Sequence, residues 1–237
     1  MGNSGSRSWR CSEKNLTSAG TATPSPLRLR LHSMGAHAAS VSSLREVMND
    51  HELTWYMQEL SMHGLGAEID FNNLIQALDN HETRQTRIVW FHLSSFLSHA
   101  AMISKYLSPI NPRGIKKDRM ELLREKLNVG DDSEVLPRDA RDNVEHFDDR
   151  IDNWVGGDGA IIEIVLDNRS GFNYLRVNEK NVKRVLLQEE LIFVSEKRDG
   201  SKFELELSPL FEEIKRIGEE ATKWIENSSP YHFIYPQ

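Results

Sequence analysis

The stretch from Glu82 to Leu107 constrains the fold more than any other part of the chain. Its middle, IVWFHLSSFLSHAAMI, is apolar on nearly every side. Ser108-Pro109 and Asn111-Pro112 follow it and predict its end, because a residue before proline is pushed out of helical geometry. A helix that is apolar nearly all round has to be covered by other elements. The sequence therefore predicts a helical bundle with this helix at its buried centre.

Shorter helices are predicted on both sides of this segment, at 43–65, Asp70–Leu78 and 116–127. The first is read as one or two helices that stop at Gly64 and Gly66, since glycine commonly follows the last helical residue. The aspartate that opens the second is a plausible N-cap. These segments would supply the helices that cover the central one.

From about residue 160 to 207 the pattern changes to strand character, in AIIEIVL, FNYLRV, VLLQEELIFVSE and KFELEL. Asp199-Gly200 lies between the last two segments and is typical of a hairpin turn. Ser208 then caps a final helix that has Pro209 at its first position. The predicted fold class is therefore mainly α. A single helical-bundle domain spans 41–228 and carries a small antiparallel β element before the C-terminal helix.

The composition restricts the class of protein. Residues 1–40 are rich in Ser, Gly, Thr and Pro, which predicts a disordered N-terminal tail, and 229–237 form a short C-terminal tail. A net charge of −7 argues against a protein that coats DNA non-specifically, but it permits a small basic site. The single cysteine, Cys11, excludes an intrachain disulfide framework and favours a reducing, cytoplasmic setting. No apolar run approaches the roughly 20 residues of a membrane helix, so we expect no membrane partner.

Charged side chains and a clear helical period coincide at Arg138–Trp154. An apolar stripe at steps of four and three predicts one amphipathic helix, formed by Ala140, Val144, Phe147, Ile151 and Trp154. With about 100° per residue, Asp142, His146 and Asp149 share a face that lies away from the stripe, and Arg141 flanks the stripe. This helix is where the sequence places a candidate chemical site.

The run Arg141-Asp142-Asn143-Val144-Glu145-His146 resembles the R-x4–6-H signature of the HEPN superfamily, in which a polar residue commonly follows the arginine. The resemblance covers about residues 82–155. It implies a helical bundle, a homodimer and a metal-independent endoribonuclease that acts on RNA, as in toxin–antitoxin and defence systems. An antitoxin or another protein would then be a partner. The strands at 160–207 depart from the family pattern, either as an insertion or as a sign of a different fold.

The resemblance also implies roles for three residues. Arg141 would bind the scissile phosphate, His146 would act in acid–base catalysis, and Asp142 would orient them. The chemistry agrees with these residue types. An arginine fork suits a phosphate whose negative charge grows in the transition state. A histidine titrates near neutral pH and can move the proton of a ribose 2′-OH. No cofactor is expected.

A non-catalytic interpretation stays open. Arg141 with Glu145, and Arg138 with Asp142, are opposite-charge pairs at i, i+4. Such pairs ordinarily just support a solvated helix face. The protein would then be a helical scaffold or a protein-binding module whose charged helix faces solvent or a partner.

Metal binding is a third interpretation. Asp142, His146 and Asp149 have a spacing that could supply oxygen and nitrogen ligands from one helix face. Further candidates are Asn153, His92 and His99. Metal sites in bundle cores more often use Glu-x-x-His pairs from two helices, which this chain lacks. The sequence therefore predicts no metal among the site residues.

Overall fold

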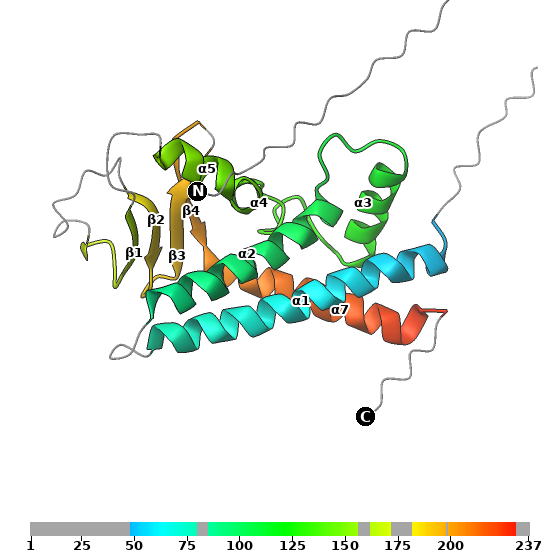
Figure 1. Ribbon diagram of the computed structural model, residues 1–237. Coiled ribbons are helices and arrows are strands. Elements are labelled where there is room, and N and C mark those ends of the chain that lie inside the picture. The colour runs from blue at the N-terminus through cyan, green and yellow to red at the C-terminus, as the bar shows by residue number, and fades with distance from the viewer. Residues whose placement is uncertain (1–47, 80–84, 156–161, 172–181, 198, 231–237) are drawn as a thin grey trace, which may run out of the picture. The chain divides into compact units, whose positions relative to one another are not determined.

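The computed structural model describes residues 48–79, 85–155, 162–171, 182–197 and 199–230 (Figure 1). The described helices are α1 (Asp50–Asp79), α2 (Thr86–Leu107), α3 (Ile115–Lys126), α4 (Asp139–Glu145), α5 (Phe147–Val155) and α7 (Leu207–Ser228). The predicted tail at 1–40 lies outside the described residues, as does most of the tail at 229–237. The described residues all belong to one compact unit of the chain.

One long helix, α1, replaces the series of short helices predicted before residue 79. Gly64 and Gly66, which were predicted to stop a helix, lie inside it, and so does Asp70, the predicted N-cap. Gly64 lies where α1 crosses α7, and a Cβ built on it would lie 2.6 Å from the Cα of Gly218. The missing side chain therefore lets two backbones approach closely, rather than ending a helix.

The predicted apolar helix is confirmed as α2, although 82–84 lie outside the described residues. It is not buried all round, because Phe91 is 63% exposed and Ile88 is 41% exposed. The helix that contacts both other long helices extensively is α1, which packs against α2 and α7 (Figure 1). The prediction of α2 as the central helix was therefore wrong, because α1 was read as separate pieces.

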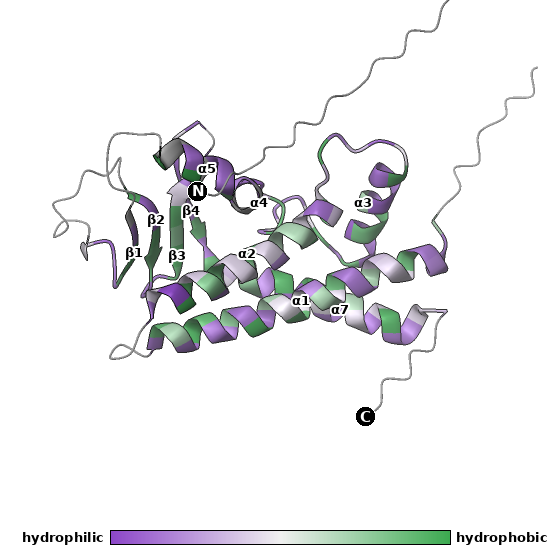
Figure 2. Ribbon diagram, in the orientation of Figure 1, coloured by the Kyte–Doolittle hydropathy of each residue, from purple (hydrophilic) through white to green (hydrophobic). Residues whose placement is uncertain are grey.

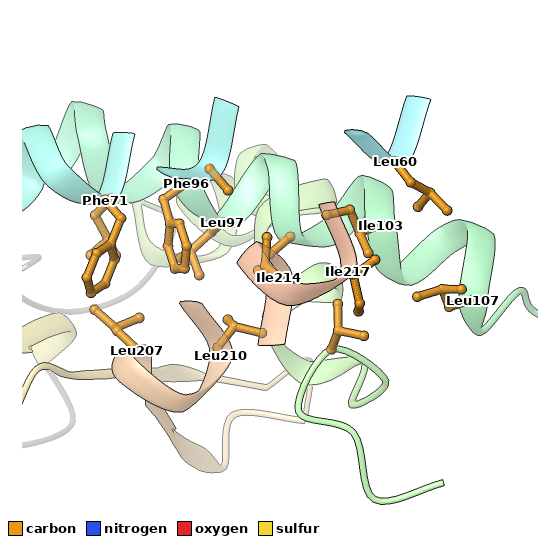
Figure 3. Packing of buried hydrophobic residues seen from close by; sticks show 14 of the residues in the cluster. Leu60, Phe71, Phe96, Leu97, Ile103, Leu107, Leu207, Leu210, Ile214 and Ile217 are labelled. Atoms are coloured by element: carbon orange, nitrogen blue, oxygen red, sulfur yellow. The ribbon is translucent and has the colours of Figure 1, made fainter. Parts of the chain in front are cut away.

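Apolar side chains from the three long helices form the main core, as Figure 3 shows. Phe71 of α1 joins the helices, because its ring packs 5.3 Å from Phe96 of α2 and stacks 4.1 Å from Phe211 of α7, centroid to centroid. Hydrophilic and hydrophobic residues interchange along α1 and α7 in Figure 2, as expected for helices with one buried face.

A small sheet stands before α7 and has the order β1-β2-β3-β4. Its strands are β1 (Ile162–Leu166), β2 (Val182–Leu187), β3 (Ile192–Glu196) and β4 (Lys202–Glu206). The β2–β3 and β3–β4 pairs are antiparallel, but β1 pairs with β2 in parallel. The prediction of an antiparallel element was therefore wrong for β1. All of FNYLRV falls within 172–181, outside the described residues.

The hairpin predicted at Asp199-Gly200 is confirmed between β3 and β4. Gly200 has a φ of +82°, which glycine adopts without strain. The Asp199 carboxylate accepts a hydrogen bond from the Ser201 backbone N–H at 2.9 Å. β4 then runs directly into α7, which begins at Leu207, one residue before the predicted cap. A mainly α fold with a small sheet before the C-terminal helix is thus confirmed, and the sheet is mixed.

Two matched substitutions in α1 test the helix crossing. We expect Gly64→Ala to lower the free energy of unfolding by about 1–3 kcal/mol, because its methyl group would meet the fixed backbone of Gly218. Gly66→Ala is the control. Its methyl group would meet a side chain, the His99 ring 2.4 Å away, instead of a backbone. That ring would have to move from its place beside Asp70, so we expect a smaller loss than in Gly64→Ala, partly offset by a gain of roughly 1 kcal/mol in helix propensity. Urea unfolding followed by circular dichroism measures both, and equal effects would contradict the crossing.

Candidate functional site

The predicted helix at Arg138–Trp154 is two helices, α4 and α5, with a break at His146. His146 has φ −119° and ψ 32°, outside α-helical geometry. Its backbone N–H still donates to the Asp142 carbonyl at 3.3 Å and ends α4. The prediction of one continuous helix was therefore wrong, and an ideal helical projection does not describe how His146 lies relative to Arg141.

Arg141 is buried, with 2% of its surface exposed. Its Nη1 donates a hydrogen bond to the carbonyl of Ser108, the residue that caps the C-terminus of α2, at 3.1 Å. Arg138 Nη2 donates to the next carbonyl, that of Pro109, at 3.4 Å. A helix C-terminus leaves carbonyl groups without helical partners and carries a partial negative charge, which favours cations there. Arg141 and Arg138, the residue that precedes α4, therefore hold this helix against the end of α2.

Asn143 is the second buried polar residue of α4. Its Nδ2 donates to Ser195 Oγ at 2.9 Å and to the carbonyl of Glu196 at 3.3 Å, both in β3. An ion pair of 2.8 Å between Lys197 Nζ and Asp139 Oδ2 lies beside this contact. The helix thus joins the end of α2 to the sheet through polar contacts.

The predicted apolar stripe agrees only in part with the burial of its described side chains, because Phe147 is partly buried and the side chains of Ala140, Val144 and Trp154 lie outside those that the structure describes. Ile151, which was predicted to face the core, is 40% exposed, whereas Arg141 and Asn143 are among the most buried polar residues of the described part of the chain. Their partners are a helix end and a strand that are distant in the sequence, so no local pattern indicates them.

His146 is accessible, with 54% of its side chain exposed. Its Nδ1 lies 3.6 Å from a carboxylate oxygen of Asp149, which is also exposed. Asp142 lies toward the other end of the motif, with Oδ1 3.9 Å from Arg141 Nε. The structure therefore pairs Asp142 with Arg141 and Asp149 with His146, instead of gathering all of them on one face.

The metal interpretation gains no support from the described residues. No group of three or more His, Cys, Asp or Glu among them is arranged to hold a metal ion. His92 and His99 turn to Asp70 instead, with ring nitrogens 3.1 and 3.6 Å from its two carboxylate oxygens. Ser95 Oγ donates to the same carboxylate at 2.5 Å. Asp70 is therefore the centre of a polar contact between α1 and α2, which the sequence did not indicate.

A partly open cavity of about 130 Å³ lies between α2, the α4–α5 break and the sheet. Its aromatic walls are Trp90, Phe147 and Phe193, and its remaining lining comes from Leu93, Leu97, Ser94, Asn143 and Arg184. We call it the Trp90 cavity. Asn143 and Phe147 belong to the motif segment, so the cavity adjoins the stretch that carries His146. Trp90 and Phe147 were predicted as core residues, and the sequence gave no sign of a cavity.

One segment of the chain is basic, although the whole chain is acidic. The segment Lys105–Lys126, from the end of α2 through α3, contains seven Lys or Arg residues and three Asp or Glu residues. The Ser108 and Pro109 carbonyls that bind Arg141 and Arg138 lie in the same segment. A local positive charge of this kind attracts phosphate groups.

No family model, curated protein or solved structure matches the chain. The HEPN resemblance therefore rests on the motif residues alone. None of the described helices combines the length and apolarity that crossing a membrane requires.

The environments of Arg141 and His146 predict unequal losses of stability when each side chain is removed. We expect Arg141→Ala to lower the free energy of unfolding by about 1–3 kcal/mol, because it removes a buried hydrogen bond and leaves the Ser108 carbonyl without that donor. The exposed His146→Ala should change it by less than about 0.5 kcal/mol. Thermal and urea unfolding measure both variants, and a stable Arg141→Ala protein would show that the side chain does not anchor α4.

His63 of α1, whose Nδ1 lies 3.0 Å from Nδ1 of His99 in α2, predicts a pH dependence of stability. Burial lowers the pKa of His63, and the neighbouring His99 lowers it further, while Glu59 acts in the opposite direction. The unfolded chain, with a histidine pKa of about 6.5, then binds a proton at His63 before the folded chain does. Stability from this residue is present above about pH 6.5 and is lost as the pH falls through the folded pKa.

Urea unfolding between pH 7.5 and 5 measures this effect. We expect the loss of stability on acidification to be smaller in His63→Gln than in the wild type. His51→Gln, at an exposed position of α1, is the control and should follow the wild type. A His63→Gln curve parallel to that of the wild type would contradict the assignment.

Proposed function

We propose that the protein is an HEPN-like, metal-independent endoribonuclease that acts on RNA as a homodimer. The observation that carries the proposal is the exposed imidazole of His146 at the α4–α5 break. The Trp90 cavity, lined by its near neighbours Asn143 and Phe147, adjoins this segment. The basic segment Lys105–Lys126 supports the choice of a phosphate-bearing substrate.

In this proposal His146 acts as the general base. It takes the proton of the ribose 2′-OH, and the 2′ oxygen attacks the adjacent phosphorus while the bond from phosphorus to the 5′ oxygen breaks. The 5′ oxygen leaves with a proton from the imidazolium of a second copy of the chain or from water. The products are a 2′,3′-cyclic phosphate and a 5′-hydroxyl. Asp149, 3.6 Å from His146, stabilises the imidazolium that forms.

We give Arg141 a positioning role, in contrast to the phosphate-binding role that the resemblance implies. Its guanidinium is occupied by the Ser108 carbonyl, so binding a phosphate would require it to leave that partner and its buried site. Arg138, one turn earlier and exposed, is better placed to attract the RNA backbone together with the basic segment. Asp142, whose carboxylate lies 3.9 Å from Arg141 Nε, shares this positioning role.

A second candidate is a non-catalytic protein-binding module. It is favoured by an apolar stripe on α1, where Trp55, Met62 and Ile69 recur at a spacing of seven and are each more than half exposed. Exposed apolar residues at helical spacing are typical of surfaces that bind another helix. The two candidates differ in one property, since only the first predicts turnover of RNA. For the first candidate, the HEPN resemblance further implies a role in toxin–antitoxin or defence systems, with an antitoxin as partner.

An RNA-cleavage assay tests the proposal. We expect the wild type to cleave single-stranded RNA in the presence of EDTA, and His146→Ala to be at least about 100-fold slower, because a general base typically contributes that much or more. His51→Ala, on the exposed start of α1, is the control and should keep full activity. Arg138→Ala should weaken RNA binding more at low salt than at high salt.

Three results would overturn the proposal. They are full activity in folded His146→Ala, activity that disappears with EDTA, and a pure, folded wild type that cleaves no RNA. The last result would favour the protein-binding module.

A further inference from the structure

The Trp90 cavity has the size of a single aromatic ring. Its volume is about 130 Å³, and an apolar cavity of roughly 150 Å³ in another protein accepts one benzene molecule. Three aromatic side chains and two leucines form most of its walls. A six-membered ring fits within this volume, whereas a bicyclic purine would extend beyond it through the open side of the cavity. The cavity therefore favours a small planar group that can stack on aromatic rings.

Charge at the cavity indicates a neutral ligand. Arg184 is the cationic residue of the lining, and its guanidinium lies over the rings of Trp90 and Phe147, 4.9 and 4.0 Å from their centroids. Glu163 already pairs with it, accepting a hydrogen bond from Arg184 Nε at 2.8 Å. Because this carboxylate balances the positive charge, the cavity does not require an anion. A carboxylate or phosphate ligand would have to compete with Glu163.

Trp90 also carries a hydrogen-bond donor that the described residues leave unsatisfied. The residue is 92% buried, and its Nε1 has no acceptor among the residues that the structure describes. A buried donor without a partner costs about 1–3 kcal/mol. This atom is covered from solvent, so a ligand carbonyl oxygen in the cavity would accept from it, and relieve that cost, only after the indole ring turns toward the ligand. The Nδ2 group of Asn143 is not available to a ligand carbonyl, because it already donates to Ser195 Oγ and to the Glu196 carbonyl in β3.

We infer that the Trp90 cavity binds a pyrimidine base of the RNA substrate. A pyrimidine is a single neutral ring with carbonyl oxygens, and unstacked RNA bases are commonly held between aromatic side chains and arginine planes. The inference rests on the proposed ribonuclease function, in which the cleaved phosphate lies at His146, adjacent to Phe147 in the chain. The enzyme would then cleave RNA next to a pyrimidine nucleotide.

Nucleotide binding to the full chain tests the cavity separately from cleavage. Calorimetric titration compares UMP, AMP and ribose 5-phosphate, the last as a control for binding through phosphate and ribose alone. We expect UMP to bind most tightly. Trp90→Phe, which keeps a ring but removes the donor, should weaken UMP binding about fivefold. Trp55→Phe, at a tryptophan that is 63% exposed on α1, is the matched control and should leave it unchanged.

A second variant keeps the test decisive if Trp90→Phe does not fold. Ser94 lines the cavity and is only partly buried, so Ser94→Phe fills the space from its side and should abolish the preference for UMP over ribose 5-phosphate. Equal binding of UMP and AMP, or UMP binding that survives Ser94→Phe, would overturn the inference.

Cleavage of oligouridine and oligoadenosine by the wild type separates the two proposals. Cleavage without base preference, together with no binding of UMP, would leave the ribonuclease standing and remove the pyrimidine cavity. Tight UMP binding that is lost in Ser94→Phe, without cleavage of any RNA, would support the cavity and overturn the proposed function. Preferential cleavage of oligouridine, reduced in Trp90→Phe and unchanged in Trp55→Phe, would support both.

Discussion

The close crossing of α1 and α7 at Gly64 and Gly218 is the constraint on which the rest of the fold depends. At this point the two backbones are too close for even one methyl group between them. The contact lets α1 pack α7 on one side and α2 on the other. Polar pairs continue the contact along the two helices, since Ser61 bonds Thr222 at 2.7 Å and Lys215 bonds Glu68 at 2.8 Å. The end of α2 and the sheet that precedes α7 are positioned by this three-helix arrangement.

Buried polar side chains attach the segment of α4 and α5 to the three long helices and the sheet. Arg141 reaches the end of α2 and Asn143 reaches β3. Burying a charged or polar side chain is unfavourable unless it is hydrogen-bonded, so these contacts are specific to one placement of α4. That placement has two consequences. It leaves His146 exposed where α4 ends, and it brings Asn143 and Phe147 to the cavity that Trp90 and Phe193 line from the other side.

Elements whose signals are local could be predicted from the sequence. Ser108-Pro109 marks the end of α2 because proline restricts its neighbour, and Asp199-Gly200 marks the β3–β4 turn because glycine tolerates its backbone angles. The role of Gly64 was predicted wrongly because the residue that requires a glycine at this position, Gly218, lies on another helix. A glycine that admits a neighbouring backbone and a glycine that ends a helix have the same local sequence, and only the partner Gly218 distinguishes them.

The geometry of the motif segment could not be predicted from the sequence. The motif indicates this segment as the candidate site, and that assignment stays a prediction. The helical projection failed because it assumed an unbroken helix and because long-range partners turn Arg141 and Asn143 inward. Trp90 and Arg184 could not have been assigned to the site, because α2 and β2 meet the motif segment only in the folded chain. Arg184 lies in β2, and the sequence around it contains no recognisable motif.

The central claim is that His146 takes the proton of a ribose 2′-OH, which fixes the chemistry of the new RNA ends. Mass spectrometry of the products from a short, uridine-containing RNA tests it most directly. The account predicts a 2′,3′-cyclic phosphate, or the 2′- or 3′-phosphate formed when it opens, on one fragment and a 5′-hydroxyl on the other. A 5′-phosphate with a 3′-hydroxyl would contradict it, because those ends arise when water, rather than the 2′ oxygen, attacks the phosphorus.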